Sequence, residues 1–146
     1  MKTVVLVTGG FDPLHSGHIE YFKYAKSLGD ELWVGLNSDE WLTRKKGRPF
    51  MPFGERMAII QNLFMVDAVL DFDDSDGSAC GAIFKTKATT GLDTKIIFAN
   101  GGDRTNQNIP ELVTYGDDPQ VEFKFGVGGQ NKINSSSWIL EEWKNP

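Results

Sequence analysis

Only one cysteine, Cys80, occurs among the 146 residues, so the chain cannot form a disulfide with itself. A lone thiol is typical of proteins in a reducing compartment, and we expect a cytoplasmic protein. No apolar run approaches the ~20 residues of a membrane-spanning helix, and the opening MKTVVLVTGG has an apolar stretch too short for a signal peptide. These absences predict a protein without a membrane partner.

Basic charge is also scarce. Lysine and arginine number 15 against 20 aspartate and glutamate residues, which gives a formal net charge of −5. Nucleic-acid affinity comes largely from many Lys and Arg contacts to phosphates, so this balance predicts no nucleic-acid partner. A local basic run, TRKKGR at 43–48, still allows an anion pocket. The length predicts a single domain over residues 1–146.

Histidine is the third scarce residue, and its placement is informative. Both histidines, His15 and His18, lie in one stretch, GGFDPLHSGH at 9–18. Before it, the β-branched run TVVLV at 3–7 predicts a buried parallel strand. After it, apolar residues recur at helical spacing up to Gly29. The stretch therefore joins the first strand to the first helix.

Along the whole chain, strand-like runs alternate with helix-like segments. Strands are predicted at 3–7, 31–37, 67–72, 95–100 and 121–125, and helices at 16–29, 52–66, 78–91 and 134–143. Segment 38–49 is predicted as a polar excursion that includes a helical turn. This order predicts an α/β fold, a Rossmann-like three-layer α/β/α arrangement with a five-stranded parallel sheet. Ligands of such sheets bind beyond the carboxyl ends of the strands.

The bend that holds the histidines has the chemistry of an anion site. Gly9 and Gly10 allow the backbone to approach a ligand closely, and the free N–H groups of the next helix point into the bend. His15 lies just before this helix and His18 in its first turn, with Gly17 leaving space between them. Each imidazole can donate a hydrogen bond to a polyphosphate. Simpler interpretations are polar capping or a zinc site, for which a third and a fourth ligand are not obvious.

The bend also resembles a family motif. GGFDPLHSGH is similar to the Gly-x-Phe-Asp-x-x-His-x-Gly-His motif of the cytidylyltransferase-like nucleotidyltransferase family. Further segments resemble family segments in the same order along nearly the whole chain: GLNSDEW, KKGRPFMPFGERMAII, ANGGDR and NSSSWIL. Their spacing is closest to the heptose-1-phosphate adenylyltransferase and glycerol-3-phosphate cytidylyltransferase branches.

The resemblance implies a reaction. A phosphate oxygen of an acceptor attacks the α-phosphorus of a nucleoside triphosphate, and pyrophosphate leaves, with Mg²⁺ as cofactor. The nucleophile is already ionised, so positioning and charge stabilisation carry the catalysis without a protein base. The implied partners are a nucleoside triphosphate and a phosphorylated small molecule. Because relatives are often dimers, a homodimer is a further expectation.

Roles for residues follow from the matching positions. The resemblance assigns catalysis to His15, His18 and Lys46, with Lys45 as the alternative lysine. It assigns nucleotide binding to a larger set: Gly9, Gly10, Phe11, Asp12, Gly17, Arg56, Gly102, Asp103, Ser135, Ser136 and Ser137. It assigns no metal ligand. Simpler interpretations are a solvated basic run for the lysines, a surface ion pair for Arg56, an Asx turn for the aspartate after Gly102 and helix capping for the serines.

The choice between branches stays open. The cytidylyltransferase branch often has an arginine where Gln130 stands, so ATP is expected slightly ahead of CTP, with a sugar phosphate as acceptor. The first alternative is cytidylyl transfer to a polyol or amino-alcohol phosphate such as glycerol 3-phosphate. The second is a non-catalytic nucleotide-binding regulatory module. The complete set of His15, Gly17, His18 and Lys46 argues against it, because a sensor has no need of them all.

Two expectations concern the loop from Asn37 to Pro52. Four close cations and few apolar anchors predict a mobile lid that orders when a triphosphate supplies negative charge. Phe50 and Phe53, which follow the basic run, are the aromatic candidates for the nucleotide pocket.

Overall fold

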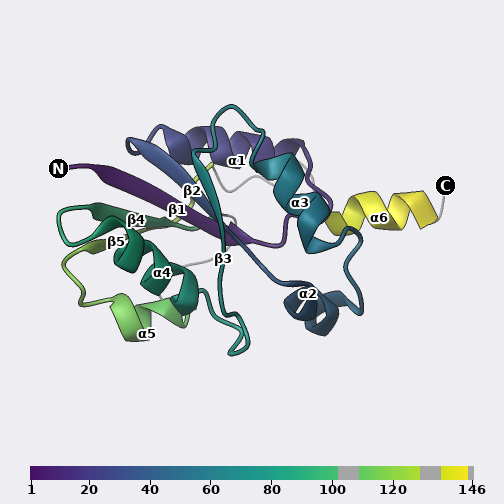
Figure 1. Cartoon of the computed structure of the whole chain (residues 1–146). Coiled ribbons are helices and arrows are strands. Elements are labelled where there is room, and N and C mark those ends of the chain that lie inside the picture. Colours follow the sequence, from purple (N-terminus) through teal and green to yellow (C-terminus); the bar gives the residue numbers. More distant parts are fainter. Residues whose placement is uncertain (102–108, 129–135, 145–146) are drawn as a thin grey trace.

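The structure, a computed structural model, describes residues 1–101, 109–128 and 136–144. Its elements are β1 (Thr3–Gly9), α1 (Ser16–Lys26), β2 (Glu31–Leu36), α2 (Asp39–Lys46), α3 (Phe53–Ile60), β3 (Ala68–Asp71), α4 (Cys80–Thr90), β4 (Lys95–Ala99), α5 (Glu111–Tyr115), β5 (Val121–Lys124) and α6 (Ser136–Lys144). The five strands form a parallel sheet in the order β3-β2-β1-β4-β5 (Figure 1). The predicted fold class is confirmed.

Helices cover both faces of the sheet, which gives three layers (Figure 1). Side chains alternate along β1, so that Val5 and Val7 pack into a core cluster with α1 and α3, whereas Leu6 packs into a second cluster with α4. All three side chains are fully buried. Because this strand is buried on both faces, its sequence is a continuous apolar run.

The position of β1 in the sheet places the site. Leu6 pairs with Trp33 of β2 and with Phe98 of β4. From β1 the chain runs outward to β2 and β3, and then crosses back to β4 on the other side of β1. Connections that leave in opposite directions open a crevice beyond the carboxyl ends of the strands. Helices α2 and α6 lie at this end of the sheet (Figure 1).

Two helices differ from the sequence-based prediction. The segment predicted as a polar excursion forms α2, and α5 lies where no helix is predicted. Ser38 caps α2 by accepting a hydrogen bond from the Trp41 N–H, and acidic residues in the first turn and basic residues in the last turn suit the helix dipole. Only Leu42 is buried in α2, so its apolar periodicity is weak.

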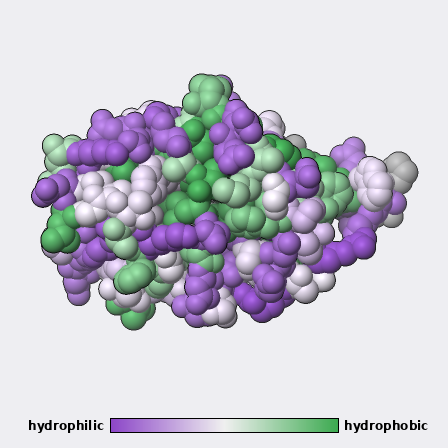
Figure 2. Space-filling view, viewed as in Figure 1, coloured by the Kyte–Doolittle hydropathy of each residue, from purple (hydrophilic) through white to green (hydrophobic). Residues whose placement is uncertain are grey.

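The molecular surface is mixed. Figure 2 shows hydrophobic residues gathered over β3 and α3 on one face, with hydrophilic residues around them. Phe64, in the turn after α3, is 85% exposed. Among the residues that the structure describes, no helix has the length and apolar character needed to cross a membrane.

Candidate active site

A pocket of about 470 Å³ opens beyond the carboxyl ends of the strands. It is lined by Thr8, Gly9, Gly10, Phe11, Asp12, His18, Asn37, Trp41, Leu42, Lys45, Lys46, Gly77, Ser78, Ala79, Glu111, Ser136 and Ser137. Most of the predicted site residues in the described part of the chain are in this lining. The exceptions are His15, Gly17 and Arg56.

The turn after β1 is folded tightly against α2. Phe11 has a φ of 49°, which is uncommon for a residue with a side chain, and the peptide bond between Asp12 and Pro13 is cis. A Cβ atom at Gly10 would lie 2.7 Å from Leu42 Cδ2. Glycine at this position therefore allows α2 to pack against the turn.

The two histidines cap α1 together. His15 is the N-cap residue, and its Nδ1 accepts a hydrogen bond from the Gly17 N–H at 3.0 Å. His18 Nδ1 accepts from the His15 N–H at 3.2 Å, which completes a reciprocal cap. The two rings stack with their centroids 3.8 Å apart, and Phe11 packs edge-on against His18 at 5.0 Å. Both imidazoles are thereby fixed at the positive end of the helix.

This geometry sets the protonation of His18. Burial, and after it the neighbouring His15, lowers the pKa of His18 from 6.5 to about 3. The ring is therefore neutral at pH 7. Because Nδ1 accepts a hydrogen bond, the ring proton lies on Nε2. His18 lines the pocket, so this N–H is a preorganised donor for an anionic oxygen.

Asp12 and Lys46 form an ion pair inside the site. Lys46 Nζ lies 3.1 Å from Asp12 Oδ2 and donates to the Asp12 carbonyl oxygen at 2.5 Å. The buried Asp12 carboxylate also accepts from the N–H groups of Phe50 at 2.5 Å and Met51 at 2.7 Å. It keeps these two donors if Lys46 moves away. The carboxylate would therefore stay hydrogen-bonded if the lysine turned toward an anion in the pocket.

Arg56 lies behind the pocket and is only 1% exposed. Its Nε donates to the Met51 carbonyl oxygen at 2.9 Å. Its Nη1 donates to the carbonyl oxygens of Gly10 at 3.0 Å and Asn37 at 2.8 Å. Its Nη2 donates to Asp39 Oδ1 at 2.7 Å. The predicted phosphate contact of Arg56 stays a prediction. In this structure the guanidinium donates to backbone carbonyl oxygens and to the Asp39 carboxylate.

The start of α6 reaches the same turn. Ser136 Oγ donates to the Pro13 carbonyl oxygen at 2.7 Å, and both Ser136 and Ser137 line the pocket. One hydroxyl thus anchors α6 beside the N-terminus of α1. The predicted positions Gly102, Asp103 and Ser135, together with Gln130, lie outside the described residues.

Comparison with known proteins identifies the family. The cytidylyltransferase-like family model matches residues 6–137. The chain belongs to the cytidylyltransferase-like family. The resemblance of the GGFDPLHSGH motif is therefore confirmed, and the chain is a nucleotidyltransferase.

Two curated relatives show how much of a longer protein this cytidylyltransferase-like chain matches. The bifunctional protein HldE of Pelobacter propionicus is 35% identical over 147 residues, which cover 97% of this chain and 28% of that protein. HldE of Actinobacillus succinogenes is 38% identical over 113 residues, which cover 70% of this chain and 24% of that protein. The chain spans about a quarter of the length of these relatives.

Solved structures agree with the fold. The lipopolysaccharide core biosynthesis protein of Thermoplasma volcanium has a TM-score of 0.64 at 29% identity, over 86% of this chain and 94% of that chain. A putative nicotinate-nucleotide adenylyltransferase of Vibrio parahaemolyticus has a TM-score of 0.66 at 13% identity, over 97% of this chain and 86% of that chain. The second likeness concerns the fold alone.

The aromatic lining of the cytidylyltransferase-like pocket differs from the expectation. Trp41 and Phe11 line it, and Lys45 Nζ lies 4.8 Å from the centre of the Trp41 ring. Phe53 packs against the core beside α1, and Phe50 is 53% exposed. Neither of these two phenylalanines is in the lining. Their place in the nucleotide pocket therefore stays a prediction; in this structure the segment meets the turn after β1 through the N–H groups of Phe50 and Met51.

One wall of the pocket is formed by residues that the sequence analysis does not predict as part of the site. Gly77, Ser78 and Ala79 precede α4 and line the pocket with Glu111. Glu111 is 1% exposed, and its Oε2 accepts from the Ala79 N–H at 3.2 Å. This carboxylate occupies the N-terminal end of α4, so an anion is better placed at α1 or α6. Glu111 comes from a helix of five residues whose position depends on tertiary contacts, which no local pattern signals.

Asp74 anchors the start of α2. It is 4% exposed and accepts from Asn37 Nδ2 at 3.0 Å, from the Ser38 N–H at 2.8 Å and from Ser38 Oγ at 2.7 Å. Burial alone raises the pKa of Asp74, but these hydrogen bonds outweigh burial and hold the pKa below its ordinary value. Leu42 is the one buried residue of α2, in line with the expectation of few apolar anchors, while polar contacts hold the start of the segment from Asn37 to Pro52. Its mobility remains a prediction.

Metal-binding chemistry is sparse in the described part of the chain. Within residues 1–101, 109–128 and 136–144, no three His, Cys, Asp or Glu side chains come together as ligands. The pocket carboxylates of Asp12 and Glu111 accept hydrogen bonds from the protein.

Proposed function

We propose that this nucleotidyltransferase transfers a nucleoside monophosphate, from ATP in preference to CTP, to the phosphate of a sugar phosphate and releases pyrophosphate. The observation that carries the proposal is the neutral His18, whose Nδ1 is used in capping and whose ring lines the pocket at the start of α1. Identities of 35% and 38% to HldE proteins support a sugar-phosphate acceptor, as does the spacing of the heptose-1-phosphate branch.

The chemistry is a displacement at phosphorus. An oxygen of the acceptor phosphate forms a bond to the α-phosphorus, the bond from that phosphorus to the bridging oxygen breaks, and its electron pair leaves with pyrophosphate. No proton has to be removed from an ionised acceptor. A neutral imidazole that donates through Nε2 therefore suits this site better than a base does, because it stabilises charge on phosphate oxygens as the transition state forms.

The other residues divide the remaining work. His15 holds the His18 ring by stacking and by its N–H. Lys46 leaves Asp12 to contact the α-phosphate, where its charge lowers the barrier, while Lys45 adds positive charge to the same wall. Ser137, at the N-terminus of α6, supplies a further donor for phosphate.

Mg²⁺ enters this proposal with the triphosphate. The pocket carboxylates among the described residues have protein partners, so phosphate oxygens and water would hold the ion. Bound there, Mg²⁺ neutralises part of the phosphate charge.

The direct test is pyrophosphate release. The protein is incubated with each of the four nucleoside triphosphates, Mg²⁺ and a panel of sugar phosphates, glycerol 3-phosphate and phosphoethanolamine. The proposal expects release that depends on both ATP and a sugar phosphate. Release with CTP and glycerol 3-phosphate alone would establish the alternative branch. Light scattering on the same sample tests the expected homodimer.

A further inference from the structure

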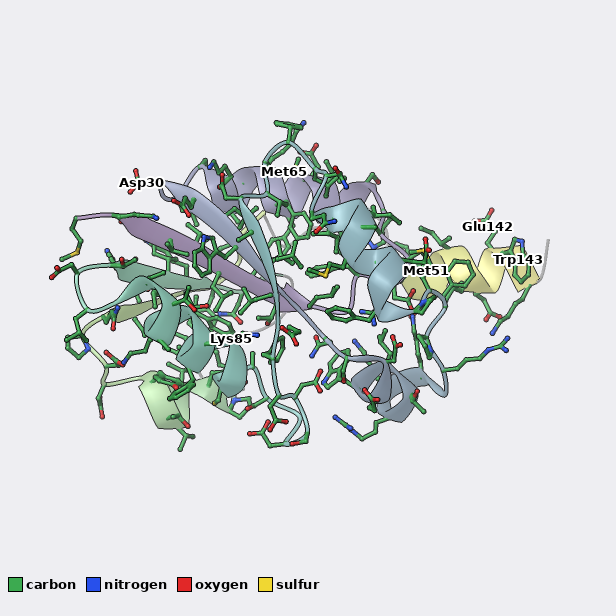
Figure 3. All side chains as sticks on the ribbon, in the orientation of Figure 1. Asp30, Met51, Met65, Lys85, Glu142 and Trp143 are labelled. Carbon is green, nitrogen blue, oxygen red and sulfur yellow. The ribbon has the colours of Figure 1, made fainter. Side chains whose placement is uncertain are left out.

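Arg56 joins four parts of the site that are distant in the sequence. Its guanidinium meets the backbone after β1 at Gly10, the backbone after β2 at Asn37, the start of α2 at Asp39 and the segment before α3 at Met51. Figure 3 shows Met51 in the connection that leads into α3. Backbone carbonyl groups need partners when they are buried, and one planar guanidinium donates to three of them, two that follow strands and one in the segment before α3.

The Met51 backbone also supports the position of Lys46, the lysine that we propose to contact the α-phosphate. The Met51 carbonyl oxygen accepts from Arg56, and the Met51 N–H donates to Asp12, which holds Lys46. Gly10, another partner of Arg56, lines the pocket one residue before Phe11. A displacement of Arg56 would therefore move both the turn that precedes His18 and the resting place of Lys46.

We propose that Arg56 is a positioning residue that sets the turn after β1 and the Lys46 segment relative to each other, and that it does not bind the triphosphate itself. Its only partner among acidic side chains in the described residues is Asp39, which balances the buried charge. A guanidinium at 1% exposure that donates to three backbone carbonyl oxygens and to Asp39 has no reason to turn toward a ligand, since the carbonyl oxygens of Met51, Gly10 and Asn37 would then lose this donor. Activity readouts for this inference rest on the proposed function.

Substituting Arg56 by lysine distinguishes the effect of its hydrogen-bond geometry from the effect of its positive charge. Arg56→Lys retains the positive charge, but an ammonium on a flexible stem cannot reach four acceptors that a planar fork reaches at once. The matched control is Arg44→Lys on α2, because Arg44 is exposed and contributes one described hydrogen bond, to the Asp74 carbonyl oxygen.

The first measurement uses nucleotide-free protein and needs no activity. In Arg56→Lys, hydrogen exchange at the Phe50 and Met51 amides should accelerate about tenfold or more, while amides of β4 stay within about twofold of the wild type. The control should match the wild type at both places. Unchanged exchange at Phe50 and Met51 would overturn the proposal, whatever the enzyme proves to catalyse.

The second measurement separates binding from turnover. Calorimetric titration should give a triphosphate Kd within about threefold of the wild type for Arg56→Lys, while turnover per folded molecule falls about tenfold or more. A phosphate ligand would instead weaken binding as much as turnover, and that outcome would also overturn the proposal. A purely stabilising role would lower the melting temperature and leave turnover per folded molecule unchanged.

A milder variant covers the case in which Arg56→Lys does not fold. Asp39→Asn removes the charge of one partner whose side chain is 39% exposed, and it leaves the three carbonyl contacts in place. The same signature is expected at smaller size: faster exchange at Met51 and lower turnover with little change in Kd. Equal values to the wild type in both readouts would count against positioning by Arg56.

Discussion

The start of α1 and two separate buried residues, Asp12 and Arg56, support the same turn after β1, but their polar atoms have different surroundings. At α1, His18 uses Nδ1 for the cap and carries its proton on Nε2 in a residue that lines the pocket. Asp12 and Arg56 are 2% and 1% exposed, and protein donors and acceptors surround both charges. All of these residues belong to segments that resemble the same family, so motif membership alone does not separate the two environments.

The difference indicates what each residue contributes. A polar group at the pocket with a fixed hydrogen-bond direction acts on the substrate, and its loss should affect chemistry more than stability. A buried charge with several protein partners acts on the backbone, and its loss should affect stability and geometry together. Four substitutions or conditions, taken from the largest expected effect to the smallest, test this distinction.

The largest effect is expected for His18→Ala. Removing one preorganised donor should lower turnover by about 10²–10³-fold. The melting temperature should change little, because His15 still accepts from the Gly17 N–H at the same helix end. Pyrophosphate release together with thermal unfolding measures both quantities. Turnover close to that of the wild type would place the reacting phosphates elsewhere.

Asp12→Ala should show the opposite balance, with stability as the first loss. The substitution leaves the Phe50 and Met51 N–H groups without their acceptor, so the free energy of unfolding should fall by about 2–3 kcal/mol. Urea unfolding measures this change. The control is Asp71→Ala, since the side chain of Asp71 is 76% exposed in its ion pair with Lys85 and should be worth less than about 1 kcal/mol. Equal losses in the two variants would contradict the buried role of Asp12.

The sequence predicts the sheet well because burial on two faces leaves a strong signal. The run TVVLV corresponds to β1, and each of the other predicted strands has its counterpart within a residue or two. Helix α2 is missed because its stability comes from Ser38 at its cap and from Asp74, a residue far along the chain. Contacts of that kind depend on the folded structure, not on local periodicity.

The residues of the candidate site also divide into those that the sequence predicts and those that depend on the packing of the fold. The histidines are predictable because a rare residue type occurs twice in one strand-to-helix turn. Trp41 and Glu111 enter the pocket lining only through the packing of α2 and α5. The spacing that resembles the family does assign a role to Arg56, but exposure decides whether a guanidinium meets a ligand or the backbone, and exposure is a property of the fold.

The next smaller effect concerns pH. Because the pKa of His18 is lowered to about 3 in the folded protein, the unfolded chain takes up a proton at higher pH than the folded chain does. The stability that depends on a neutral His18 is therefore fully present above the ordinary histidine pKa of 6.5. It is lost as the pH falls from there toward 3, since the unfolded chain then binds the proton more readily. Between pH 7 and 5.5 the loss should be about 1 kcal/mol. Urea unfolding of wild type and His18→Ala at both pH values isolates this contribution, and parallel pH profiles would contradict it.

The smallest effect separates the two tasks of His15. His15→Ala removes the N-cap acceptor of α1 and should lower the free energy of unfolding by about 0.5–1 kcal/mol. His15→Ser keeps an acceptor for the Gly17 N–H and should recover most of this loss. Neither variant retains the ring that stacks on His18 at 3.8 Å, so both should lose turnover to a similar degree. If His15→Ser recovered turnover along with stability, His15 would act as a helix cap alone. His18 would then be the one imidazole at the start of α1 that contributes to turnover.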